Sequence, residues 1–143
     1  MDYTWLIFAI LSAIMAALVA IFGKIGLEGI DANTATMIRA GIMFAFLILV
    51  IAFTGKMENF TTIFSNSKTL SYIFLSGIAG ALSWLFYFLA LKIGKVSQVA
   101  PIDRLSIVFV IILSVLIIGE EINWKIAIGT ALMAVGAILV ALG

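Results

Sequence analysis

The sequence predicts an all-α membrane protein with five transmembrane helices. Of its 143 residues, 65% are hydrophobic and only 10% are charged, which is far less charge than a water-soluble domain carries. Five segments reach or approach the roughly 20 apolar residues that span a bilayer core. They lie at about 4–25, 32–54, 69–91, 96–118 and 124–142. We expect them to form a single domain over residues 1–143.

Charge and residue usage argue against several classes of function. The net charge is +1 and the lysines and arginines are dispersed, which does not fit a nucleic-acid surface. The chain has neither cysteine nor histidine, so it lacks the commonest general base and the commonest metal ligands. We therefore expect no enzyme activity, no catalytic residues, no metal site, no cofactor and no nucleic-acid partner.

Small residues mark one side of the first and the last segment. In 4–25 they recur at spacings of three and four, as Ala9, Ser12, Ala13, Ala16, Ala20 and Gly23. In lipid, small residues let helix backbones approach closely, so this side is either a packing seam or a cavity lining. The small residues of 124–142 indicate packing, and Trp124 is typical of an interface anchor.

The second segment, 32–54, contains one charged residue, Arg39. By helical rise it lies about 10 Å in from the helix start. A long arginine side chain can snorkel so that its charge reaches water, or it can face the interior of a bundle and serve function. The sequence leaves both roles open.

The third segment, 69–91, has no charge and one small, polar face. Ser76, Gly80, Ser83 and Tyr87 recur at spacings of four, three and four, with Trp84 at the edge of the face. Such a face is either a packing seam or a cavity wall. The aromatic residues favour a cavity, because they lie within the span rather than in the interfacial belt.

The fourth segment, 96–118, carries the only proline of the chain and an acid–base pair. Pro101 lies in its first turns, where a missing N–H costs little and a local kink is possible. Asp103 and Arg104 are neighbours, so their side chains diverge by about 100° and need other partners. Arg39 lies at a similar depth from the same membrane face, and we expect it to pair with Asp103. The alternative is a purely structural role for Asp103 and Arg104.

The distribution of cations gives the chain almost no preferred orientation. On one side of the membrane lie Lys56, Lys68 and Lys125, and on the other lie Lys24, Lys92 and Lys95 with Arg39 just inside. An excess of Lys and Arg normally sets orientation. A nearly balanced chain with five crossings can insert both ways and pair as an inverted repeat, which is a symmetry that many transporters use. We expect dual topology and an antiparallel homodimer.

Short motifs in a fixed order suggest a family. They are the Gly23-to-Gly29 end of the first segment, Arg39, Gly77 to Trp84, Tyr87 to Lys92, Val99 to Ser106, and Gly119-Glu120 with Trp124. With these motifs the chain resembles the EamA domain of the drug/metabolite transporter superfamily, in its single-repeat, five-helix bacterial and archaeal form. The resemblance covers nearly the whole chain.

The resemblance implies transport of small metabolites across the inner or plasma membrane, commonly export of amino acids or related compounds. One departure concerns coupling. Small multidrug exporters of the same superfamily use an acid deep in the first helix, and here that helix has none. If transport is coupled to protons, Asp103 is the one acid inside a predicted span that could carry them. Pairing with Arg39 would make Asp103 a poor proton carrier near neutral pH, so facilitated or exchange transport stays open.

We expect a substrate site at the subunit interface, lined by the first, third and fourth segments, in a transporter that works by alternating access. Its predicted residues are Trp84 and Tyr87 for stacking, Ser83 and Gln98 for hydrogen bonds, and Arg39, Asp103 and Arg104 for charge. Two arginines and an acid would suit an anionic or zwitterionic metabolite. The alternatives are a lipid-linked-sugar flippase and a non-transporting assembly or scaffold protein.

Overall fold

The computed structural model describes residues 3–143, with the side chains of residues 59–61 left aside. Within this part of the chain every regular element is helical, and five segments are long and apolar enough to cross a membrane. The predicted all-α membrane protein with five transmembrane helices is confirmed. Contacts divide the chain into unit 1, Met1–Lys24 with Ile93–Gly143, and unit 2, Ile25–Lys92. The expected single domain stays a prediction.

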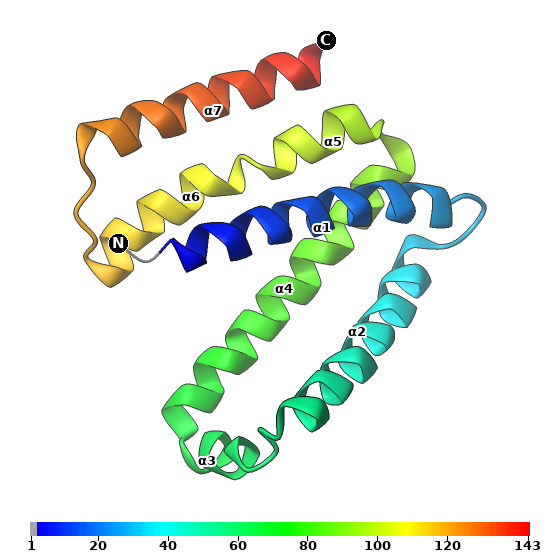
Figure 1. The fold of residues 1–143 in the computed structure, drawn as a ribbon. Helices are drawn as coiled ribbons and strands as arrows, with labels where there is room; N and C mark the ends of the chain where they lie inside the picture. Colours follow the sequence, from blue (N-terminus) through cyan, green and yellow to red (C-terminus); the bar gives the residue numbers. More distant parts are fainter. Residues whose placement is uncertain (1–2) are drawn as a thin grey trace. The chain divides into compact units, whose positions relative to one another are not determined.

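Unit 2 is a helical hairpin. Its two spans are α2 (Ala32–Thr54) and α4 (Ser67–Ile93), and the short α3 (Asn59–Ser65) joins them. α2 and α4 run in opposite directions along the hairpin (Figure 1). The residues near the start of α2 therefore lie at the same end of the hairpin as those near the end of α4.

Local signals set both ends of α2. Asp31 Oδ2 accepts a hydrogen bond from the Thr34 backbone N–H at 2.9 Å and another from Thr34 Oγ1 at 3.0 Å, so a backbone donor that the helix leaves unpaired has a partner. At the other end Gly55 adopts φ 66°, a left-handed conformation that suits glycine. These caps set the depth of Arg39 along the span.

Unit 1 contains the first, fourth and fifth spans. They are α1 (Thr4–Gly26), the pair α5 (Val96–Asp103) and α6 (Ser106–Leu113) with a π-helical turn at Ser114–Ile118, and α7 (Trp124–Leu142). Both α5 and α6 pack on α7. Lys24 Nζ donates a hydrogen bond to the Gly94 carbonyl at 2.9 Å, which holds the end of α1 to the turn before α5.

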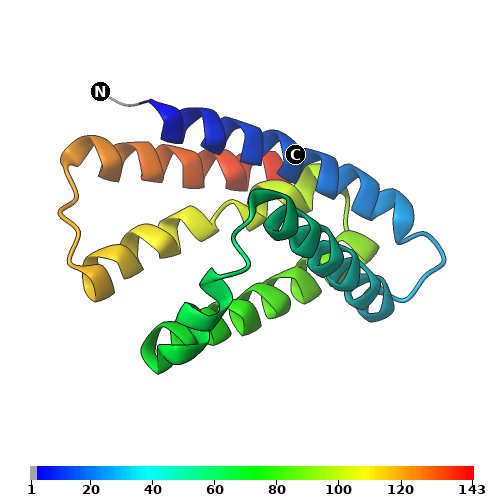
Figure 2. The same cartoon turned by 60° about the horizontal axis from the view of Figure 1, so that its bottom comes forward.

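The fourth span is interrupted about a third of the way along (Figure 2). The Leu105 N–H donates to the Ile102 carbonyl at 3.0 Å, and the Ile107 N–H donates to the Arg104 carbonyl at 3.2 Å. These bonds reach back three residues instead of four, so the helix tightens here. The interruption follows Pro101, whereas a proline removes the bond to the carbonyl four residues before it. The predicted kink at Pro101 stays a prediction.

Very little of the described chain is buried. The buried hydrophobic residues are Ala20, Leu27, Ala32, Phe88 and Leu91, and no described polar or charged residue is buried. In a bilayer an exposed apolar face costs little, because lipid tails are as apolar as leucine. The large apolar surface of the spans therefore fits contact with lipid or with another chain.

Candidate functional site

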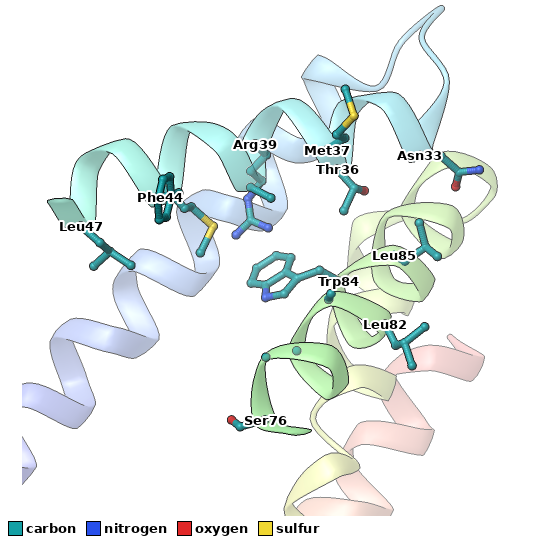
Figure 3. A pocket seen from close by; sticks show the side chains of 15 residues that line it. Asn33, Thr36, Met37, Arg39, Phe44, Leu47, Ser76, Leu82, Trp84 and Leu85 are labelled. Atoms are coloured by element: carbon teal, nitrogen blue, oxygen red, sulfur yellow. The ribbon is translucent and has the colours of Figure 1, made fainter. Parts of the chain in front are cut away.

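A pocket of about 800 Å³ lies between α2 and α4, entirely within unit 2 (Figure 3). Most of its lining is apolar, and five residues have polar side-chain atoms. The lining consists of Asn33, Thr36, Met37, Arg39, Ala40, Met43, Phe44, Leu47, Ser76, Gly77, Gly80, Ala81, Leu82, Trp84 and Leu85. The pocket therefore combines an apolar body with a few polar groups, as small-molecule sites do.

Arg39 and Trp84 meet across this pocket (Figure 3). The guanidinium carbon of Arg39 lies 3.4 Å from the centroid of the Trp84 ring and 5.2 Å from that of Phe88. A cation over an aromatic face is attracted by the ring quadrupole, by up to about 2 kcal/mol where water is excluded. The contact holds the charge of Arg39 inside the hairpin.

Two further aromatic rings support Trp84. The Tyr87 ring meets it edge-on, with centroids 5.8 Å apart and an interplanar angle of 85°. The Phe88 ring lies 5.7 Å from it at 36°, and Phe88 is only 3% exposed. Aromatic pairs at such distances stabilise one another beyond the burial of area. Trp84 is therefore contacted by two neighbouring rings, which support the surface that it offers to Arg39.

The polarity of the pocket changes along α2. Asn33, Thr36 and Arg39 line it near the start of the helix, and Met43 and Leu47 continue the Arg39 face one and two turns further. The Thr36 hydroxyl donates to the Ala32 carbonyl at 2.7 Å, so it can offer a ligand only its oxygen lone pairs. One end of the pocket is thus polar and cationic, and the rest is apolar.

Two glycines, Gly77 and Gly80, line the α4 side of the pocket and bring no side chain into it. A Cβ added at Gly77 or Gly80 would meet no heavy atom within 4 Å. The space beside these two residues is therefore open.

Four of the predicted substrate-binding residues belong to unit 2. Arg39 and Trp84 line the pocket, and the Tyr87 ring contacts that of Trp84 edge-on. Ser83 is exposed and is not among the lining residues. Of the small, polar face predicted on this helix, Ser76 and Gly80 also line the pocket.

The other predicted residues belong to unit 1. The Gln98 side chain donates a hydrogen bond to the Ala141 carbonyl at 3.3 Å, which joins α5 to α7. Asp103 is the last residue of α5 and is partly buried, and Arg104 is exposed at the interruption. Because Arg39 lies in unit 2 and Asp103 in unit 1, their pairing stays a prediction.

Sequence reasoning missed several residues of the pocket. Phe88 is the second aromatic neighbour of Arg39, and Met43, Phe44 and Leu47 supply much of the apolar wall. A signal for two of these was present, because Met43 and Leu47 follow Arg39 at spacings of four and therefore share its helix face.

Comparisons with known proteins agree on a family. The EamA-like transporter family matches residues 3–142. A protein of Sinorhizobium sp. named "Uncharacterized transporter in cobO 3'region" is 41% identical over 141 residues, and the match covers 99% of each chain. No solved structure matches the chain. The match extends over nearly every residue, as the resemblance of the motifs predicted, and the chain belongs to the EamA-like transporter family.

Proposed function

We propose that the chain is a secondary transporter that exports small metabolites, such as amino acids or related compounds, by alternating access in an antiparallel homodimer. The observation that carries this proposal is the pocket between two membrane-spanning helices, with Arg39 held over Trp84 inside it. Charged residues inside membrane spans are costly and mark substrate or ion pathways by default. The family of the chain agrees, since it is one of transporters rather than enzymes.

The interruption of the fourth span is consistent with a helix whose two halves move during transport. In secondary transporters, discontinuous helices contribute to the substrate site, and irregular backbone at membrane depth lines a cavity. The interruption at Arg104 and Leu105 separates two eight-residue helices, α5 and α6, which can reorient about it. We assign Asp103 and Arg104 to the substrate pathway at this position, together with Gln98 and Ser83 as polar contacts.

The balance of charge and the exposed apolar surface support dimerisation. The cations near the helix ends are nearly balanced between the two sides of the membrane, and orientation depends on such a bias. The exposed apolar faces of the spans leave ample surface for a second copy. Two oppositely inserted copies would complete the inverted repeat and enclose a path at the bilayer midplane.

The test combines flux with topology. Purified protein in liposomes should exchange labelled amino acids or related metabolites against an internal pool. Since the chain contains no cysteine, single Cys residues in the connector 55–68 and at the C-terminus can be labelled from outside intact cells. Partial labelling of both positions is expected for dual topology. Labelling of each position from one side only would contradict the antiparallel homodimer.

The rival functions give different results in the same preparation. A scaffold or assembly protein would show no exchange with any metabolite. A lipid-linked-sugar flippase would copurify with a lipid-linked precursor and show no exchange of water-soluble metabolites. Either result would remove the metabolite-transporter proposal.

A further inference from the structure

The charge of Arg39 has no anionic partner in its own unit. Among the described residues of unit 2, its guanidinium contacts aromatic rings and makes no hydrogen bond or ion pair. Stacking uses the face of the planar guanidinium and leaves the N–H donors in its plane, where they match the two oxygens of a carboxylate. The N–H groups of the Arg39 guanidinium are therefore left to donate hydrogen bonds to an acceptor from outside unit 2.

The pocket around Arg39 is cationic overall. Of the fifteen lining residues, Arg39 alone carries a charge, and none is an acid. A charge held among apolar side chains inside a membrane span is costly until an opposite charge joins it. A ligand with one negative charge would remove that cost, whereas a dianion would bring a second charge with no partner among the lining residues.

We propose that this pocket binds organic monocarboxylates, with the carboxylate on Arg39 and an apolar body against Met43, Phe44 and Leu47. The inference rests on the proposed transport function, because it names the class of substrate. Its support is the arrangement along α2, where the one cation is followed by an apolar wall on the same helix face. Tyr87 and Phe88 are positioning residues, since they hold the Trp84 ring that orients the guanidinium.

The same anionic chemistry has two sources. A soluble carboxylate and the phosphodiester of an anionic lipid each present oxygens that share one negative charge. We assign the site to the soluble carboxylate, because its polar end is flanked by Asn33 and Thr36 near the start of the span. The experiment separates the two sources.

Trp84 provides a local probe. The chain has three tryptophans, Trp5, Trp84 and Trp124, so a Trp5→Phe, Trp124→Phe protein fluoresces from the pocket alone. In nanodiscs of phosphatidylcholine, isovalerate should change the Trp84 emission saturably, and isovaleramide, its uncharged isostere, should not. An equal response to the amide would overturn the proposal.

Variants of Arg39 test the role of the guanidinium. Arg39→Lys should weaken isovalerate binding by about 10-fold because it loses the bidentate geometry, and Arg39→Gln should abolish it. Lys56→Gln, which removes a cation from the connector, should bind as the parent does. Unchanged binding by a folded Arg39→Gln would overturn the proposal. If that variant does not fold, the acid and amide comparison in the parent protein still decides.

Two further measurements, in nanodiscs of anionic lipid and of metabolite flux, separate the remaining explanations. If nanodiscs of phosphatidylglycerol alone shift the Trp84 emission and block isovalerate, a lipid phosphate occupies the pocket and the monocarboxylate assignment falls. Isovalerate binding without any metabolite flux would remove the transporter proposal and leave the anion site in place. Flux of uncharged metabolites without isovalerate binding would remove the anion site and leave the transporter proposal.

Discussion

Unit 2 and unit 1 each place charge inside a membrane span, and they accommodate it in different ways. In unit 2, Arg39 lies in an unbroken helix and its guanidinium rests 3.4 Å from the Trp84 ring centroid. In unit 1, Asp103 and Arg104 lie where the helix itself is interrupted. An aromatic surface therefore holds the first charge, whereas the backbone changes around the other two.

We infer from this difference that unit 2 binds the substrate and that unit 1 moves during transport. A charge stacked on a supported ring is pre-organised, as a binding group should be. Charges at a helix interruption can move with the two halves of the span, as a coupling or gating element should. The four predictions below test this division, from the largest expected effect to the smallest.

Neutralising the acid of unit 1 should have the largest effect. We expect Asp103→Asn to lower flux by about 100-fold or more, which corresponds to about 2.7 kcal/mol, because it neutralises a charge inside a membrane span. Dimerisation, measured by cross-linking in the membrane, should persist. Glu120→Gln, which neutralises an acid in the turn before α7, is the control. Wild-type flux from Asp103→Asn would leave the transport role to unit 2 alone.

Removing the aromatic surface of unit 2 should affect affinity more than maximal rate. Trp84→Ala should raise the KM for exchange by about 10- to 30-fold, because a cation–π contact away from water is worth about 2 kcal/mol. Trp84→Phe keeps a weaker ring face and should raise KM by about 3-fold. Trp124→Phe is the matched control. Equal losses in Trp84→Phe and Trp84→Ala would show that the ring face is not what matters.

Filling the pocket should discriminate among substrates by size. Gly80 lines the pocket, and a Cβ there meets nothing within 4 Å, so Gly80→Ala should keep at least about half of the exchange rate. Gly80→Leu should lower exchange by about 10-fold, since three further carbons would occupy space beside the α4 wall. The loss should grow with substrate volume across a homologous series. A loss that is independent of volume would place the transported molecule elsewhere.

The smallest effect concerns the cap of α2 and its dependence on pH. The pKa of Asp31 is lowered from 3.8, chiefly by the hydrogen bond from the Thr34 backbone N–H. Folding is therefore favoured by the ionised cap above pH 3.8, and this stabilisation is lost as pH falls through the lower folded pKa. Asp31→Asn caps a helix without titrating. Between about pH 5 and pH 3 the melting temperature of the parent should fall more than that of Asp31→Asn. Parallel curves would rule out this role for Asp31.

The membrane spans, and some of the residues at the pocket, could be predicted from the sequence. Apolar runs of sufficient length can only be membrane helices here, and Arg39 and Trp84 stand out because a cation and a large ring are unusual within such runs. Their mutual contact was not predictable, because 45 positions separate them and the contact depends on how two helices rotate about their axes. The contact between Arg39 and Trp84 depends on how α2 and α4 pack in the hairpin.

The interruption of the fourth span was also beyond the sequence. No glycine or proline stands at Arg104 or Leu105, and these are the residues that usually break helices. Pro101 makes a kink possible three residues earlier, but nothing in the sequence indicates a break at Arg104 and Leu105. α5 and α6 both pack on α7, so the interruption lies between two segments that share one neighbouring helix.

The small number of buried residues has a consequence for how this chain can evolve. In a packed core, exchanging one large apolar side chain for a smaller one leaves a cavity and costs about 1–5 kcal/mol. Where an apolar side chain faces lipid, acyl chains fill the space that a smaller residue leaves. The positions that face lipid can therefore drift among leucine, isoleucine, valine and phenylalanine, while the few that hold Arg39 in its pocket cannot.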